Sequence, residues 1–291
     1  MAWGEPIRKT ETPIISKEDR MKEIKNKLMN KNKVLTNKLT CGIFSTEGTG
    51  KSGLVLNYII KFLKDNPTAF AKVIDVDNGF AELLNFYDSE ITKRIFVSNP
   101  VTFKETESEG KKNYEIDNIE TLNNIKEDIY GIKELINNGD NSFQILVLDG
   151  LSFLLKNCEN QLRIEKHINV DGGINLSYWK RRNELFLQII EFIKALPINT
   201  FFIGHEDFLR NQTGELSSVK QQLLATLHQI IETSKDIDEK NKIVVFKATI
   251  KKSKYNILEE ENVYVFAEKT ESQYWFDEKG IFSKLKQQTK K

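Results

Sequence analysis

Eight consecutive residues from Ser45 to Ser52 have the types and spacing of a phosphate-binding loop. They read Ser-Thr-Glu-Gly-Thr-Gly-Lys-Ser, close to the pattern G-x-x-x-x-G-K-S/T. Glycines let successive backbone N–H groups turn towards one anion, and the helix that follows directs the positive end of its dipole at the same point. In such a loop Lys51 reaches the β- and γ-phosphates of a nucleoside triphosphate, and the Ser52 hydroxyl binds magnesium. The first position, normally Gly, is Ser45, which keeps a small residue at the turn.

The segments on either side fit the strand and helix that such a loop requires. Leu39–Phe44 is apolar and strand-like, and a helical pattern follows the loop at Leu54, Val55, Tyr58, Ile59, Phe62 and Leu63. The alternative is an ordinary surface turn, because Gly-Lys-Ser also occurs by chance. We expect a strand, loop and helix over Leu39–Leu56. The residues expected to bind the nucleotide are Ser45, Thr46, Glu47, Gly48, Thr49, Gly50, Lys51, Ser52 and Gly53.

Acidic residues follow the next apolar strand. Phe70–Ile74 is strand-like and runs into Asp75 and Asp77. Open α/β sheets do their chemistry at the carboxyl ends of their strands, so a carboxylate here could orient or deprotonate an attacking water. Alternatively, these acids cap a helix that begins near Phe80. The sequence does not decide whether Asp75 or Asp77 faces the nucleotide.

Two later strands also end in polar residues. Phe143–Leu148 is a buried-type strand that ends in Asp149, which we expect to hold magnesium together with Ser52. Thr200–Ile203 leads to His205. If this strand lies next to the Asp149 strand, His205 can sense the γ-phosphate. No Cys/His spacing indicates a zinc site.

Basic and aromatic residues surround a Gly-Gly break. Residues 156–183 include Lys156, Arg163, Lys166, His167, Gly172, Gly173, Tyr178, Trp179, Lys180, Arg181 and Arg182. Cations can follow a nucleic-acid backbone while rings stack on bases, so the segment could contact single-stranded DNA. A surface loop that leads into an amphipathic helix over Asn183–Ala195 fits equally well.

The order of the elements predicts an α/β fold with a mainly parallel central sheet flanked by helices and a C-terminal antiparallel strand pair. We expect residues 1–38 to form an arm and a basic helix over Ser16–Asn32, whose charged face is either solvated or binds nucleic acid or a neighbouring subunit. Residues 39–291 form the main domain, with an exposed insertion or β-hairpin at about 99–118. The other expected elements are a short strand Arg94–Ser98, helices Ile119–Ile136 and Val219–Ile231, a strand Ile243–Ile250, and the terminal pair Asn262–Ala267 and Ser272–Phe276.

Composition limits the partners and the compartment. Lys and Arg number 43 against 42 Asp and Glu, so any partner preference must come from where the charges lie. Cys41 and Cys158 sit in or beside apolar runs, which favours buried reduced thiols and a cytoplasmic protein. No apolar run reaches the length of a membrane span and the N-terminus lacks a signal-peptide pattern, so we expect no membrane association.

The ordered motifs resemble those of RecA-like P-loop ATPases, and most closely the small single-domain Sak-type annealing ATPases of phages. The resemblance covers about Leu39–Phe282. It implies ATP and Mg²⁺ as cofactors, a homo-oligomer that is a ring or a filament, and action on single-stranded DNA in recombination, repair or replication. The location it implies is the cytoplasm of a prokaryotic or phage-infected cell.

The resemblance also implies roles for particular residues. Asp77 falls where the family has the water-activating acid, more often Glu, and His205 falls where bacterial recombinases commonly have Gln. Lys252 and Lys254 match a lysine-x-lysine run that reaches the ATP of the neighbouring subunit. The catalytic set is then Lys51, Asp77, Asp149 and His205. The segments Gly172–Arg182 and Phe208–Ser218 match two mobile DNA-binding loops.

Two other functions are compatible with the same motifs. One is a KaiC-like regulatory ATPase that does not bind DNA, and the other is an assembly module that holds ATP as a structural ligand without hydrolysing it. The near-neutral charge favours these alternatives. The ordered set of motifs favours the ATPase that acts on DNA.

Overall fold

The computed structural model describes residues 22, 38–85, 87, 89–108, 111–169, 172–205, 218–240, 242–254, 263–269 and 274–276. Contacts divide the chain into residues 1–36 and residues 37–291, and all described residues except Lys22 belong to the second unit. The expected N-terminal arm, the helix over Ser16–Asn32 and the loop over Phe208–Ser218, apart from Ser218 itself, lie outside the described residues.

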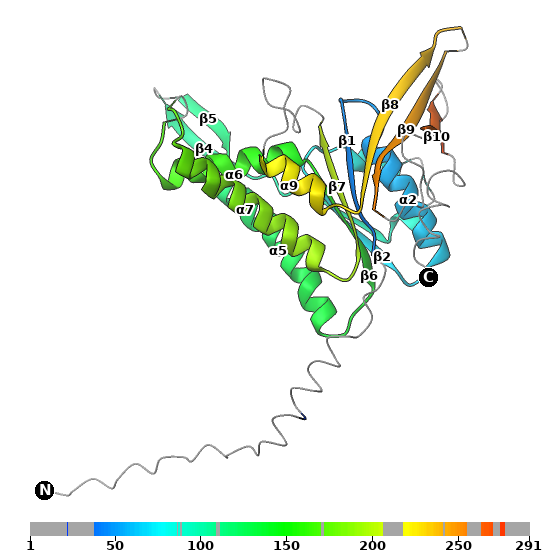
Figure 1. The fold of residues 1–291 in the computed structure, drawn as a ribbon, viewed down its shortest axis with the longest axis horizontal. Coiled ribbons are helices and arrows are strands. Elements are labelled where there is room, and N and C mark those ends of the chain that lie inside the picture. The colour runs from blue at the N-terminus through cyan, green and yellow to red at the C-terminus, as the bar shows by residue number, and fades with distance from the viewer. Residues whose placement is uncertain are drawn as a thin grey trace, which may run out of the picture. The chain divides into compact units, whose positions relative to one another are not determined.

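A nine-stranded sheet forms the centre of the described unit (Figure 1), in the order β11-β10-β9-β8-β1-β7-β6-β2-β3. Its strands are β1 Thr40–Ser45, β2 Phe70–Asp75, β3 Ile95–Ser98, β6 Phe143–Asp149, β7 Asn199–His205, β8 Gln229–Asp238, β9 Ile243–Ser253, β10 Val263–Lys269 and β11 Tyr274–Phe276. Neighbouring strands from β8 to β3 run parallel, while β8, β9, β10 and β11 pair antiparallel. The predicted fold class is confirmed, including the terminal antiparallel pair.

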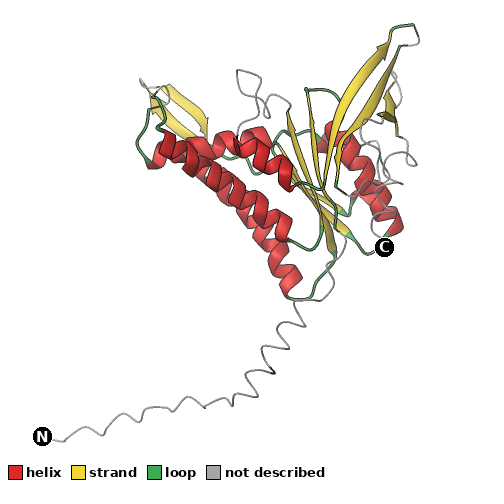
Figure 2. Cartoon of the chain, in the orientation of Figure 1, coloured by secondary structure: helices red, strands yellow, loops and turns green. Residues whose placement is uncertain are grey.

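Helices cover both faces of this sheet (Figure 2). On one face lies α2, and on the other lie α5, α6, α7 and α9. The helices are α2 Lys51–Asp65, α3 Phe80–Leu84, α4 Ser89–Thr92, α5 Asn118–Asn137, α6 Leu151–Glu165, α7 Leu176–Ala195 and α9 Ser218–Thr226. Each parallel strand is therefore buried on both sides, which explains why these strands are apolar throughout rather than alternating.

Successive strand residues fill two separate cores because side chains alternate across a sheet. In β7, Phe201 packs with the α2 side chains, whereas Phe202 packs with α5, α6 and α7. Ile43 and Phe44 divide in the same way. Both cysteines are free and buried in these cores, as expected. Among the described residues, no helix is both long and apolar enough to span a bilayer.

The polar stretch after β3 is a β-hairpin, which was one of the two forms expected for it. β4 Phe103–Ser108 pairs antiparallel with β5 Lys111–Ile116, and the pair forms a sheet of its own. Asp117 then caps α5, because its carboxylate accepts the backbone N–H groups of Ile119 and Glu120.

Two expected boundaries were wrong. The helix expected over Val219–Ile231 ends at Thr226, and Gln229 begins β8, whose side chains alternate between buried and half-buried to Thr233. A period of two fits a strand, and β8 pairs with the edge of β1. The helix expected from Asn183 begins at Leu176, capped by Asn175. Tyr178–Arg182 is therefore helical rather than part of a loop.

Candidate nucleotide site

The expected site residues converge on one edge of the sheet. Ser45 at the end of β1 pairs with His205 at the end of β7, and Asp149 at the end of β6 pairs with Asp75 at the end of β2. β7 lies between β1 and β6, as expected for the strand that carries His205. Parallel α/β sheets bind their ligands at this carboxyl edge.

The phosphate loop has the backbone form that its glycines permit. Gly48 and Gly50 adopt φ angles of 70° and 84°, in the left-handed region that side-chain-bearing residues avoid. A Cβ at Gly50 would also lie 2.9 Å from a ring carbon of Phe246. Gly50 is the N-cap of α2 and supplies no capping side chain. The N–H groups of the first turn can therefore face an anion.

Ser45 replaces the usual glycine without disturbing the loop, because its hydroxyl has a partner. Ser45 Oγ donates to the carbonyl oxygen of Thr233 in β8, and Thr49 Oγ1 lies 2.8 Å from Thr233 Oγ1. The sequence did not identify Thr233 as part of the site. The alternation of buried residues from Gln229 to Thr233 was the signal that could have revealed its strand.

Lys51 is folded onto the loop. Its Nζ donates to the carbonyl oxygens of Thr46 at 2.7 Å and Ser45 at 3.3 Å. Burial lowers the pKa of Lys51, and nearby carboxylates, led by that of Asp149, act in the opposite direction. The ammonium group thus stands at the mouth of the loop, where phosphate oxygens could replace the two carbonyl partners.

Ser52 and Asp149 meet directly. Ser52 Oγ donates to Asp149 Oδ2 at 2.6 Å, and Asp149 is only 2% exposed. Burial raises the pKa of Asp149 to about 7, against the effect of the Ser52 hydrogen bond. A cation bound here would stabilise the ionised carboxylate. Asp149 and Ser52 therefore fit magnesium, which takes oxygen ligands.

The protein supplies few metal ligands at this place. In the part of the chain that the structure describes, no group of three or more His, Cys, Asp or Glu side chains could hold a metal ion. Magnesium typically binds one or two protein oxygens and takes its other ligands from substrate phosphates and water. The Ser52–Asp149 pair matches that mode better than an all-protein metal site.

The structure separates Asp75 from Asp77. Asp75 is 1% exposed, and its carboxylate accepts the backbone N–H groups of Gly79 at 3.0 Å and Phe80 at 2.8 Å. It holds the turn that leads into α3, as the capping alternative expected. Asp77 instead points to His205, whose Nε2 lies 3.6 Å from Asp77 Oδ2. Burial raises the pKa of Asp77, while His205 acts to lower it.

Lys252 and Lys254 do not lie at this edge within the chain. Lys252 pairs with Ile230, which in turn pairs with Gly42 in the first half of β1, away from the phosphate loop. Its Nζ donates to the carbonyl oxygens of Leu224 at 2.7 Å and Ala225 at 3.2 Å, near the end of α9. Burial, followed by the charge of Lys254, lowers the pKa of Lys252.

Two arginines near the Gly-Gly break are engaged within the chain. Arg163 pairs with Glu159 at 3.2 Å and donates to the carbonyl oxygens of Asn169 and Gly172, each at 2.9 Å. Arg182 approaches the same Glu159 at 3.5 Å and lies 4.2 Å from the centre of the Trp179 ring. These side chains fix the junction between α6 and α7. Lys156, Lys166, His167, Lys180 and Arg181 are exposed.

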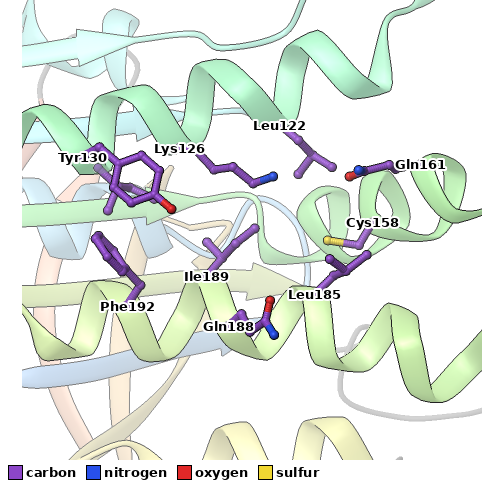
Figure 3. Close-up of a pocket in the computed structure, with 10 residues that line it drawn as sticks. Leu122, Lys126, Tyr130, Cys158, Gln161, Leu185, Gln188, Ile189 and Phe192 are labelled. Atoms are coloured by element: carbon purple, nitrogen blue, oxygen red, sulfur yellow. The ribbon is translucent and has the colours of Figure 1, made fainter. Parts of the chain in front are cut away.

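A cavity of about 410 Å³ lies among α5, α6 and α7 (Figure 3). Apolar side chains and the Cys158 thiol line it, together with the polar ends of Lys126, Gln161 and Gln188. The rings of Tyr130 and Phe192 lie 4.9 Å apart at one end. None of its lining residues comes from the phosphate loop, so it is separate from the candidate nucleotide site.

Comparison with known proteins gives one family match. Residues 37–215, which include the phosphate loop, Asp77, Asp149 and His205, match the model of an AAA domain family. No curated protein sequence matches the chain.

Three solved structures are similar to the chain. A KaiC-like protein from the hyperthermophilic archaeon Pyrococcus horikoshii OT3 has a TM-score of 0.45 and 14% identity, covering 78% of this chain and 84% of its own. The RadB recombinase has a TM-score of 0.41 and 16% identity, covering 79% and 87%. The flagellar accessory protein FlaH from Methanocaldococcus jannaschii has a TM-score of 0.44 and 13% identity, covering 79% and 85%.

Proposed function

The chain belongs to the AAA domain family and is a RecA-like P-loop ATPase, and on this premise we propose that it hydrolyses Mg-ATP as a homo-oligomer that acts on single-stranded DNA. Recombination, repair or replication is the process in which it acts. Its resemblance to Sak-type proteins assigns this action to the cytoplasm of a prokaryotic or phage-infected cell.

The observation that supports ATP hydrolysis most strongly is the hydrogen bond between Ser52 and Asp149. It joins the end of the phosphate loop to the end of β6 at 2.6 Å, across 97 residues of sequence. A hydroxyl and a buried carboxylate in this position supply the protein oxygens for magnesium bound to a triphosphate. When bound, magnesium neutralises charge on the phosphate oxygens.

The protein groups then have distinct tasks. Lys51 and the loop N–H groups hold the β- and γ-phosphates, exchanging the Thr46 and Ser45 carbonyls for phosphate oxygens. Asp77 orients the attacking water and accepts its proton, for which its raised pKa is suited. His205 lies beside Asp77 and contacts the γ-phosphate, so it registers the loss of that group.

Exposed charge at the start of α7 supports the DNA part of the proposal. Lys180 and Arg181 are exposed in the first two turns of the helix, directly after the Gly-Gly break. They can reach phosphates, while Arg163 and Arg182 hold the junction in place. DNA bound here would lie at the α6–α7 junction.

ATP turnover on one protein preparation without DNA, with single strands and with duplex tests the proposal. We expect single strands to raise turnover and Lys51→Ala to abolish it. Turnover that no DNA changes would remove the DNA part, and a wild-type protein that releases no phosphate from Mg-ATP would remove the hydrolysis.

Retention on single-stranded DNA at increasing salt tests the surface. The double variant Lys180→Glu/Arg181→Glu should bind more weakly, and its salt slope should be shallower by about 2, because each lost phosphate contact removes about one unit. The matched control is Lys240→Glu/Lys269→Glu, which changes the same net charge at exposed lysines elsewhere. Equal loss in both double variants would contradict a specific surface.

A further inference from the structure

A second lysine lies against the phosphate loop. Lys235 belongs to β8, and its Nζ lies 3.3 Å from the position that a Cβ would occupy at Gly48. Gly48 stands in the middle of the loop, three residues before Lys51. We propose that Lys235 is a phosphate-binding residue supplied by the same chain, a second cation for the nucleotide that Lys51 binds. This inference rests on the proposed function.

The strand fixes which way Lys235 faces. Residues two apart in a strand share a face, so Lys235 lies on the same side of β8 as Thr233. Thr233 already holds the loop, through its carbonyl oxygen to Ser45 Oγ and its Oγ1 to Thr49 Oγ1 at 2.8 Å. β8 pairs with β1 only up to Glu232 and then continues beyond the end of β1. Lys235 is therefore carried past the sheet edge to the height of the loop.

The neighbouring strand supports the same position. Lys235 pairs with Phe246 of β9, and a Cβ at Gly50 would lie 2.9 Å from the Phe246 ring. That ring packs against Phe266 with centres 6.1 Å apart. The backbone that carries Lys235 is thus fixed relative to Gly48 and Gly50, although the lysine side chain itself is exposed.

The charges nearby call for an anion. Other lysines of this strand pair have acidic partners: Lys247 pairs with Asp236, and Lys251 lies 3.2 Å from Glu232. Lys235 makes no ion pair with any other residue that the structure describes. It faces a loop that carries Lys51 and inward N–H groups, which are also positive. A phosphate between these groups would satisfy all of them.

A cation from the same chain differs from one supplied by a neighbouring subunit. Lys252, one of the residues expected to act across subunits, donates instead to the carbonyl oxygens of Leu224 and Ala225. Lys235 reaches the loop with no second subunit present. ATP affinity that depends on Lys235 should therefore not depend on assembly.

Calorimetric titration with ATP, with and without magnesium, tests this role. We expect Lys235→Gln to weaken ATP binding by about tenfold, the range of one charge-assisted hydrogen bond, and Lys235→Arg to keep most of the affinity. Lys240→Gln, an exposed lysine in the turn of the same hairpin, is the control and should bind like the wild type. Circular dichroism and thermal unfolding without nucleotide check that each variant folds.

The outcomes separate the two levels of the proposal. Wild-type protein that binds no ATP would overturn the proposed function and this inference with it. Wild-type binding with equal affinity in Lys235→Gln would overturn the role of Lys235 alone. A loss in Lys235→Gln that is absent in Lys240→Gln supports it.

A mixing experiment tests whether the lysine acts within one chain. Lys235→Gln and Lys51→Ala proteins are combined, and ATP turnover is measured. If Lys235 acts within its own chain, the mixture should show no more turnover than the sum of the two variants, because no subunit holds both residues. Restored turnover would show that Lys235 serves the loop of a neighbour and would overturn the same-chain assignment.

Discussion

His205 and Asp77 face each other across the carboxyl edge of the sheet, with His205 Nε2 3.6 Å from Asp77 Oδ2. Asp77 comes two residues after the end of β2, and His205 is the last residue of β7. β6 lies between these two strands, so its last residue, Asp149, ends between them in the sheet order. A water-activating acid and a phosphate sensor would thus stand on either side of the magnesium carboxylate.

Asp77 and Asp75 provide a matched pair of variants. Asp77→Asn should lower the turnover number by about 100-fold or more while leaving ATP binding within a few-fold, because it removes a proton acceptor but no phosphate ligand. Asp75→Asn should instead lower the free energy of unfolding by about 1–2 kcal/mol, since its carboxylate accepts two backbone N–H groups. Steady-state kinetics and chemical denaturation measure these effects. The reverse pattern would exchange the two roles.

His205 should affect turnover more than binding. His205→Ala is expected to lower ATP turnover by about tenfold and to abolish stimulation by single-stranded DNA, because the side chain that registers the γ-phosphate is lost. His205→Gln keeps a donor at this position and should retain part of both. Kinetics with and without DNA would show this. An Ala variant that responds to DNA like the wild type would exclude the sensor role.

Asp149 should make the stability of the nucleotide-free protein depend on pH. Its pKa is raised from 3.8 to about 7, so the folded state holds a proton that the unfolded state releases. The stabilisation from that proton is complete below about pH 3.8 and is lost as the pH rises through about 7. At pH 8, Asp149→Asn should raise the free energy of unfolding, by an amount on the order of 2 kcal/mol, while turnover is lost. Denaturant titrations at several pH values, without magnesium, would detect this. A variant that is less stable than the wild type at pH 8 would contradict the assignment.

Lys252 and Lys254 should separate a structural role from a role between subunits. Lys252→Gln removes a cation that binds two carbonyl oxygens near the end of α9, so it should lower the melting temperature by a few degrees. Lys254 is exposed beyond β9. If it completes the site of a neighbour, Lys254→Gln should slow turnover only at protein concentrations that allow assembly. Wild-type turnover per subunit that never changes with concentration would exclude this contribution.

The Cys158 thiol should react slowly while the protein is folded. Burial raises its pKa to about 12, and it is 1% exposed in the cavity among α5, α6 and α7. Alkylation at pH 8 should be more than about 100-fold slower than in denaturant, because little thiolate forms and access is restricted. A Cys41→Ser variant assigns the signal to Cys158. Rapid labelling of the folded variant would show that the cavity opens readily.

Local patterns allowed much of this molecule to be predicted from the sequence. The loop from Ser45 to Ser52 is recognisable because its glycines, lysine and hydroxyl are required at fixed spacing. The buried strand before Asp149 is recognisable because a parallel strand covered on both faces is apolar throughout. Strand β8 was missed because Gln229 and Thr233, though buried, are polar, and the apolar residues before them continued a helical pattern.

The sequence by itself determined the phosphate loop, the strands that end in Asp149 and His205, and the α/β class, since each depends on residue types within a short segment. Only the tertiary structure decided that Asp75 caps α3 while Asp77 faces His205, because the chain turns after β2 and residues two apart no longer share a direction. It also placed Thr233 and Lys235 beside the loop, 188 residues after Ser45 in the case of Thr233. Pairing between distant strands makes that contact, and no local pattern records it.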